Sequence, residues 1–283
     1  MKKLVVHLHI YYKDMWKEIK SYLSNITVPY DLYVTMVSED SKLTEDIKRF
    51  HKNSIIWIVE NRGYDIGPFI DFLHRINLNE YDYILKLHTK SKSGVDTVIN
   101  RLAFSKNDWV NTLLKSLIGS KKQFDRNIIK LEEQTSLGMI GSKVLISSKG
   151  KINEGLKDKL EFLQDKFGYR NKNVKFIPGT MFLCRAKLMQ IIKDNYKITD
   201  FEKTDAKVKD GSLGHVLERL FGYIVIAQGY KIDGFDSFLP IYLKYFYKSF
   251  FKLFYQNTIT NSNHRIIKIC KIPVYHKKMK EGI

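Results

Sequence analysis

Short apolar runs alternate with amphipathic segments between residues 4 and 90. Runs rich in β-branched and aromatic residues are typical of strands, whereas apolar residues spaced three and four apart are typical of helices. We therefore predict strands over residues 4–10, 32–37, 54–59 and 83–87, and helices over residues 15–23, 43–50 and 67–76. The strand at 54–59 is expected to be buried. This alternation favours an α/β fold, with a mostly parallel sheet flanked by helices.

The alternation becomes less regular after residue 92. We predict a helix over 106–118, a short strand over 137–140, and an amphipathic helix over about 156–167 within a lysine-rich insertion. A strand over 175–185, interrupted by a bend at Pro178-Gly179, and a helix over 210–222 complete the pattern. Because no repeat or low-complexity linker interrupts the chain, we expect one domain over residues 1–239 and an extension over residues 240–283.

The extension is basic and aromatic. It begins with PIYLKYFYKSFFKLFYQ, in which lysines recur every four residues at Lys244, Lys248 and Lys252. On a helix this spacing gathers the lysines into a stripe and leaves a broad aromatic face. We therefore predict a C-terminal helical extension that lies on an anionic membrane surface and does not span the membrane. The alternative is an ordinary helix that packs its aromatic side chains on the preceding domain.

Composition and charge narrow the partners. With 283 residues, 44% of them hydrophobic, the chain can bury a full core. The net charge of +18 implies an anionic partner, which could be nucleic acid, a nucleotide phosphate or anionic lipid. Two cysteines are too few for a disulfide framework, so a reducing cytoplasm is the simplest environment. No run of 18 apolar residues occurs, and the first run is interrupted by His7 and His9, so we predict neither a span nor a signal peptide.

Polar clusters follow two of the predicted strands. The strand at 54–59 is followed by a turn that contains Asn61, Arg62, Gly63 and Asp65, and the strand at 83–87 is followed by His88, Thr89 and Lys90. Ligands of open α/β sheets bind beyond the carboxyl ends of the strands, so we expect both clusters to line one pocket. Lys86, inside the second strand, is placed by period-two alternation opposite Leu85 and Leu87.

The chemistry of these clusters allows more than one interpretation. Asp65 either caps the following helix or binds a ribose or base. Lys90 could place a point charge on a diphosphate, and His88 could donate to phosphate or bind a metal. The second strand is not followed by Asp-x-Asp, so no metal site is predicted, although a divalent metal stays open.

The helix predicted over 210–222 carries a third cluster. Its spacing places His215, Glu218 and Gly222 on one face, which could be no more than a surface ion-pair face. Asp210 could cap this helix. Either Asp210 or Glu218 could instead be a general base, since that role requires a carboxylate within reach of an attacking hydroxyl.

Four motifs in this order resemble the rhamnan synthesis protein F family. The members of this family are bacterial glycosyltransferase-like proteins of surface and cell-wall polysaccharide assembly. The resemblance extends over about residues 4–235 and rests on residues 61–69, residues 85–90, residues 178–182 and residues 210–222.

The resemblance implies a GT-A-type nucleotide-sugar transferase with a Rossmann-type sheet. It implies that Asp210 is the acceptor's base, with Glu218 as the second candidate and His215 on the same face. The remaining candidate substrate-binding residues are Asn61, Arg62, Gly63, Asp65, His88, Thr89, Lys90, Gly179 and Thr180. This chain has His88-Thr89-Lys90 where GT-A enzymes usually carry Asp-x-Asp. The negative charge of the donor diphosphate would then have to be neutralised by Lys90, Arg62 or His88.

The resemblance also implies the partners. The reaction would be a single displacement that moves a sugar, with dTDP-rhamnose as the suggested donor, to a lipid-linked glycan at the inner face of the plasma membrane. Two other classes stay open, a non-catalytic sugar-nucleotide-binding protein and a basic nucleic-acid-binding module. We expect no nucleic-acid partner, because no nucleic-acid-binding motif is present.

Overall fold

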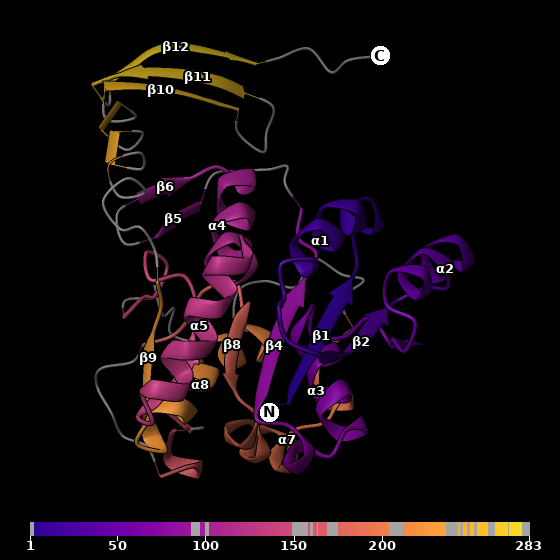
Figure 1. The fold of residues 1–283 in the computed structure, drawn as a ribbon. Coiled ribbons are helices and arrows are strands. Elements are labelled where there is room, and N and C mark those ends of the chain that lie inside the picture. The colour runs from indigo at the N-terminus through magenta and orange to yellow at the C-terminus, as the bar shows by residue number, and fades with distance from the viewer. Residues whose placement is uncertain are drawn as a thin grey trace.

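A computed structural model of the chain describes residues 3–91, 97–99, 102–148, 158, 161–162, 164–168, 175–203, 212–235, 243, 246–247, 250–251, 254–259, 264–270 and 272–278. Its main feature is a seven-stranded sheet (Figure 1). In chain order the strands are β1 (Leu4–Ile10), β2 (Tyr30–Met36), β3 (Ile55–Ile58), β4 (Tyr83–His88), β7 (Leu137–Ile140), β8 (Phe182–Arg185) and β9 (Lys231–Asp233).

The sheet is mostly parallel, as the alternation of strands and helices predicts. Its spatial order is β3-β2-β1-β4-β8-β7-β9. The pairs among β3, β2, β1 and β4 are parallel, as is the pair of β7 with β9. Only β8 runs against its neighbours, β4 and β7. The observed α/β fold is consistent with the GT-A-type architecture that the resemblance implies.

Helices cover both faces of the sheet (Figure 1). Buried side chains of α1 (Trp16–Leu23), α2 (Ser41–Phe50), α4 (Lys106–Ile118) and α5 (Lys121–Glu133) share one hydrophobic core. Those of α3 (Ile66–Arg75), α7 (Gln190–Asn195) and α8 (Leu213–Ala227) share the other. Short 3-10 helices occur at Lys13–Met15, Leu78–Glu80, Ala186–Met189 and Ile198–Asp200.

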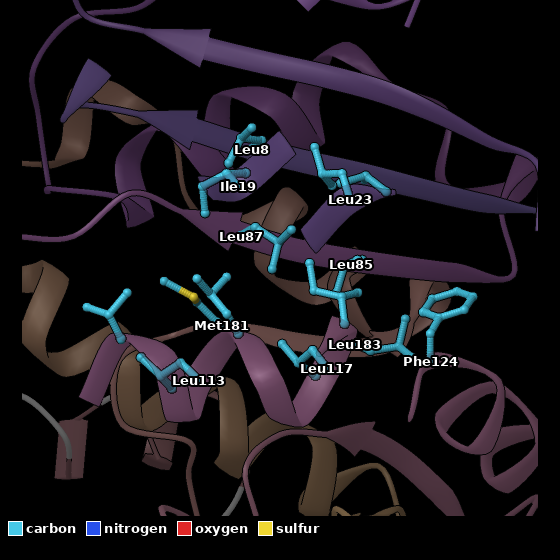
Figure 2. Close-up of a cluster of buried hydrophobic side chains, with 14 of the residues drawn as sticks. Leu8, Ile19, Leu23, Leu85, Leu87, Leu113, Leu117, Phe124, Met181 and Leu183 are labelled. Carbon is cyan, nitrogen blue, oxygen red and sulfur yellow. The ribbon is translucent and has the colours of Figure 1, made fainter. Parts of the chain in front are cut away.

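Alternation along the central strands explains the two cores. Leu4, Val6 and Leu8 of β1 belong to the first core and Val5 belongs to the second, so the strand is buried on both faces. Figure 2 shows the first core where leucines of β1 and β4 meet α1 and α4. The labelled side chains are Leu8, Ile19, Leu23, Leu85, Leu87, Leu113, Leu117, Phe124, Met181 and Leu183. This packing fixes the positions of the strand ends that carry the polar clusters.

The structure confirms most predicted elements and corrects two. The helix over 106–118 and the strand over 137–140 have the predicted bounds. The strand predicted over 54–59 as buried is the edge strand β3, whose Ile55 and Ile58 are 47% and 41% exposed. An apolar run does not reveal whether the sheet continues beyond it. The strand predicted over 175–185 begins only at Phe182, after the Pro178-Gly179 turn. Of the helix predicted over 156–167, residues 158, 161–162 and 164–166 are helical, residue 167 lies in a turn, and the other positions lie outside the described residues.

The extension departs from the helical prediction. Residues 243, 246–247, 250–251 and 254 are helical, but the chain then forms the antiparallel strands β10 (Tyr255–Ile259), β11 (His264–Ile269) and β12 (Ile272–Lys278). This three-stranded sheet lies apart from the seven-stranded sheet (Figure 1). Period-two stretches rich in isoleucine and valine after residue 264 favour strands over helix. Within the described parts of the chain, every helix is too short or too polar to cross a membrane. A small hairpin joins β5 (Thr97–Ile99) and β6 (Leu102–Phe104).

Candidate functional site

The candidate site lies beyond the carboxyl ends of β1 and β4. β1 pairs with β2 on one side and with β4 on the other, so the order of strands reverses between β1 and β4. Such a topological switch point leaves a crevice in which open α/β sheets bind ligands. Two adjoining cavities are present at this point.

The first cavity has a volume of about 370 Å³. Aromatic and basic side chains dominate its lining, which comes from the ends of β1 and β4, the turn before α3, and the start of α4. The lining residues are His9, Tyr11, Tyr12, Asn61, Tyr64, Asp65, His88, Thr89, Lys90, Ser91 and Lys106.

The second cavity has a volume of about 410 Å³ and lies toward α8. Its lining residues are Tyr64, Asp65, Ile66, Lys90, Gly179, Thr180, Gly214, His215 and Glu218. Tyr64, Asp65 and Lys90 line both cavities. A ligand that bridges the two cavities would therefore pass a carboxylate and an ammonium group.

Lys86 holds the centre of the site together. Its side chain is completely buried, and Nζ donates to Asp65 Oδ2 at 2.5 Å, to the Thr180 carbonyl at 3.0 Å and to the Thr180 hydroxyl at 3.2 Å. Three oxygen acceptors match the three donors of an ammonium group. The Thr180 hydroxyl also donates to Asp65 Oδ2. Lys86 thus ties β4 to the turn before α3 and to the turn before β8.

Asp65 and Lys86 form a buried ion pair. Burial alone would raise the pKa of Asp65, but the charges of His88 and Lys86 and the Lys86 hydrogen bond outweigh it, so the pKa of this carboxyl is lowered. Burial lowers the pKa of Lys86, and the Asp65 carboxylate counteracts that effect. The Asp65 carboxylate is therefore ionised where the two cavities meet, and the Lys86 ammonium balances its charge.

The turn at residues 178–180 connects three elements of the site. His88 Nε2 donates to the Gly179 carbonyl at 2.8 Å, and the Gly179 amide donates to Glu218 Oε1 at 2.6 Å. Gly179 has φ +87°, which favours glycine, and a Cβ there would lie 2.8 Å from Leu113. Because one carboxylate oxygen of Glu218 is held by the turn, this side chain has a fixed position at the wall of the second cavity.

A row of polar groups runs beneath the site along one face of the sheet. His7 pairs in register with Lys86, and His9 pairs with His88. His7 Nε2 and His9 Nδ1 lie 3.1 and 3.0 Å from the Thr35 hydroxyl of β2. Burial lowers the pKa of His9 to about 3 and of His88 to about 4, and it lowers the pKa of His7 as well. These three imidazoles are therefore neutral at pH 7.

We expect this row to make the protein sensitive to acid. The unfolded chain protonates its histidines below pH about 6.5, whereas folded His9 and His88 stay neutral to about pH 3 and 4. Stability is then full above pH about 6.5 and falls as the pH drops, by roughly 4 kcal/mol between pH 7 and 5 for these two histidines. Urea denaturation across this range measures the loss. His9→Asn should make the dependence shallower, and an equal slope in this variant would contradict the assignment.

Thr89 has a structural role in the first cavity. Its hydroxyl accepts the backbone N–H groups of Tyr11 and Tyr12, each at 2.9 Å, and its own amide donates to the His9 carbonyl. This arrangement fixes the chain after β1, where the two tyrosine rings meet edge to face at 5.0 Å. Aromatic rings at a cavity wall can stack on the flat face of a nucleobase.

Two lysines make the first cavity positive. Lys90 follows β4, and Lys106 is the first residue of α4. Burial, together with the charge of Lys90, lowers the pKa of Lys106. Two ammonium groups near a helix N-terminus favour an anionic ligand, because an anion would relieve their repulsion.

The structure sorts the predicted site residues into three groups. Those that line a cavity are Asn61, Asp65, His88, Thr89, Lys90, Gly179, Thr180, His215 and Glu218. Arg62 and Gly63 serve the turn itself: Arg62 binds Glu60 and the Phe201 carbonyl, and a Cβ on Gly63 would lie 2.3 Å from the Phe201 ring. Asp210 lies outside the described residues.

Two details refine the predicted roles. Asp65 precedes α3 but does not cap it with its side chain, so the capping interpretation is wrong and the carboxylate is directed to Lys86. His215 Nδ1 lies 2.8 Å from the Ser212 hydroxyl, which fixes the imidazole at the second cavity. The alternation of the sequence sets Lys86 apart without giving it a role, and the site residues that the sequence does not single out include His9, Tyr11, Tyr12, Tyr64 and Lys106.

Among the residues that the structure describes, no three His, Cys, Asp or Glu side chains gather in a metal-binding cluster. The site is instead built around an ammonium group, Lys86, that contacts oxygen atoms from two turns.

The comparisons with known proteins concern most of the chain. Residues 1–230 match the family model for rhamnan synthesis protein F. WxcX of Xanthomonas campestris pv. campestris is 25% identical over 240 residues, which cover 83% of this chain and 33% of WxcX, in strain B100 and again in strain ATCC 33913. The chain thus spans about a third of the length of the curated relatives that it matches.

Similar solved structures include S. aureus TarS. Residues 1–349 of TarS in complex with UDP-GlcNAc match at 14% identity and a TM-score of 0.40, covering 79% of this chain and 54% of that one. A longer TarS structure matches at 10% identity and a TM-score of 0.41, covering 80% and 34%.

Proposed function

Because the chain belongs to the rhamnan synthesis protein F family, we propose that it is a glycosyltransferase. It moves a sugar from a nucleotide-sugar donor to a growing surface polysaccharide or cell-wall glycan. The donor is a nucleotide sugar such as dTDP-rhamnose, the acceptor is lipid-linked, and the reaction inverts the anomeric configuration.

One observation carries this proposal: two cavities of different character meet at Asp65 and Lys90. The first cavity combines tyrosines with two lysines, which suits a base and a diphosphate. The second contains the anchored carboxylate of Glu218, which suits an acceptor hydroxyl. The anomeric carbon of a nucleotide sugar joins the diphosphate to the sugar. With the diphosphate in the first cavity, this carbon would lie where the two cavities meet and face the acceptor in the second cavity.

The proposed reaction is a single displacement. The acceptor hydroxyl oxygen attacks the anomeric carbon while the bond from that carbon to the diphosphate oxygen breaks. The hydroxyl proton passes to Glu218 or to Asp210, and the new negative charge on the nucleoside diphosphate is stabilised by Lys90 and Lys106. Of these two bases, Glu218 has support from its fixed position at the second cavity.

Asp65 is proposed to orient the donor sugar. The contacts described for its carboxylate with Lys86, Thr180 and His88 all involve Oδ2. Oδ1 can therefore accept a hydrogen bond from a sugar hydroxyl at the junction of the cavities. Lys86 does not meet the donor in this scheme, because its three donors are occupied by Asp65 and Thr180.

Lys90→Ala is expected to weaken the binding of nucleoside diphosphates about tenfold, since it removes one of two cations from the first cavity. Isothermal titration with dTDP and UDP measures the change. Lys115→Ala, an exposed lysine of α4, is the matched control and should bind as wild type does. Unchanged affinity for both nucleotides in Lys90→Ala would remove the phosphate role of this lysine.

Transfer is expected to survive chelation of divalent ions, because β4 ends in His88-Thr89-Lys90 and not in a pair of carboxylates. Product formation with and without a chelator measures this property. Complete inhibition that manganese reverses would contradict the prediction.

A further inference from the structure

Six large apolar side chains form one exposed helical face in the C-terminal extension. They fall at positions i, i+3, i+4, i+7, i+8 and i+11, which is the spacing of a continuous stripe on a helix. Each of them is 44–64% exposed. We call them the C-terminal aromatic face: Leu243, Phe246, Tyr247, Phe250, Phe251 and Phe254.

The rings of this face contact one another along the helix. Phe246 stacks with Phe250 at a centroid distance of 6.2 Å, Tyr247 stacks with Phe251 at 6.4 Å, and Phe250 meets Phe254 at 5.0 Å. A contiguous apolar surface of this kind is unusual on a soluble protein and marks an interaction site. The predicted alternative, in which these aromatics pack on the preceding domain, does not fit their exposure.

The adjoining sheet continues the apolar character. The Cys270 amide donates to the Phe254 carbonyl at 2.9 Å, which joins the last helical residue to the turn between β11 and β12. At this end of the sheet, Tyr255, Ile269 and Ile272 are in register across the three strands, and the side chain of each is at least half exposed. The helix end and the adjacent sheet end are therefore both apolar.

The charge of the extension is almost entirely positive. From residue 241 onward the sequence has nine Lys or Arg residues and a single acidic residue, Glu281. Strand register places Arg265 directly opposite Lys277, and Lys277 is exposed. The two cationic side chains add to the positive field of this sheet, which attracts anions. Lys244, Lys248 and Lys252 occupy sequence positions between the members of the aromatic face.

We propose that this surface docks the protein on an anionic lipid membrane. The C-terminal aromatic face enters the interface between headgroups and acyl chains, while the basic residues of β11 and β12 contact the lipid phosphates. An exposed aromatic face on a helix, with basic residues nearby, is a common form of such an interfacial anchor. Charge complementarity selects this occupant over a second copy of the chain, which would bring the same positive charges together.

Membrane docking is separate from sugar transfer, so it can be measured in an assay that does not depend on transferase activity. Full-length protein is sedimented with vesicles of phosphatidylcholine alone, and with vesicles that also contain phosphatidylglycerol. Wild type should pellet with the anionic vesicles at low salt. Phe250→Ser combined with Phe251→Ser should lower the partition coefficient about tenfold or more, because apolar area no longer enters the interface.

Two further variants separate charge from apolar contact. Arg265→Gln combined with Lys277→Gln should weaken binding to anionic vesicles about fivefold for each charge removed. Ile129→Ser removes a 49% exposed isoleucine from helix α5, outside the extension, and should bind as wild type does. Phe251→Ser alone, at the most exposed position of the face, serves if the double variant folds poorly.

Equal pelleting of wild type and the Phe250/Phe251 variant would overturn the proposal, since the net charge alone would then explain binding. The proposal would also fail if wild type ignored vesicles and sedimented as a dimer that the same substitutions dissociate. That result would assign the face to a second copy of the chain.

Discussion

Lys86→Met is expected to destabilise the protein by about 3 kcal/mol or more, because removal of one partner from a buried ion pair leaves the other charge uncompensated. The side chain of Lys86 is completely buried, and its ammonium is the counter-charge of Asp65. The substitution also frees the Thr180 carbonyl and hydroxyl, so the turn that holds Glu218 loses its attachment to β4. Urea denaturation measures the change in unfolding free energy.

A surface pair provides the matched control. Lys20 Nζ lies 2.8 Å from Asp46, and both side chains are about one-third exposed. Lys20→Met should cost less than about 1 kcal/mol, since exposed ion pairs contribute little. Adding Asp65→Asn to Lys86→Met should recover part of the lost stability, because the uncompensated charge is then absent. Equal, small effects of Lys86→Met and Lys20→Met would show that Lys86 does not hold the site together.

Glu218→Gln is expected to lower turnover by about 10² to 10⁴, the usual contribution of a general base. A glutamine can still accept the Gly179 amide, which the structure places 2.6 Å from Glu218 Oε1, so the fold and the cavity should be preserved. The loss should therefore fall on kcat, with donor affinity and melting temperature unchanged. Steady-state kinetics and nucleotide titration separate these quantities.

Asp210→Asn is the companion variant. If Glu218 is the base, Asp210→Asn should retain most of the turnover. The opposite result, a large loss in Asp210→Asn with nearly normal turnover in Glu218→Gln, would move the base to Asp210. Nearly normal turnover in both variants would exclude both carboxylates as the catalytic base.

The sequence predicts the fold well because most of the chain follows simple periodicities. β1 and β4 consist mainly of apolar residues, are buried on both faces, and are flanked by helices with clear apolar stripes, so their place in a central parallel sheet follows from pattern alone. Pattern does not determine where a sheet ends, which is why β3 is exposed where burial was expected. It also does not show that the extension changes from helix to strand at Tyr255.

The candidate site is only partly visible in the sequence. Clusters at the strand ends locate the cavities, but their partners lie far away in the chain: Asp65 contacts Thr180, and Glu218 contacts Gly179. Lys86 can be noticed in the sequence because it is a lysine between two leucines within a strand. Alternation correctly predicts that its side chain lies on the opposite face of the sheet from Leu85 and Leu87. His7 and His9 alternate in the same way on β1, so a search for polar residues on one face of adjacent strands would have found the row.

The most direct test is a transfer assay with the full-length protein, a panel of nucleotide sugars that includes dTDP-rhamnose, and lipid-linked glycan acceptors. Mass spectrometry follows the acceptor, and Glu218→Gln serves as the matched negative control. We expect the acceptor to gain the mass of one sugar residue with at least one donor, together with release of an equal amount of nucleoside diphosphate. Tight binding of a nucleotide sugar without any gain in acceptor mass, in wild type as in Glu218→Gln, would contradict the assignment and indicate a protein that binds nucleotide sugars without transferring them.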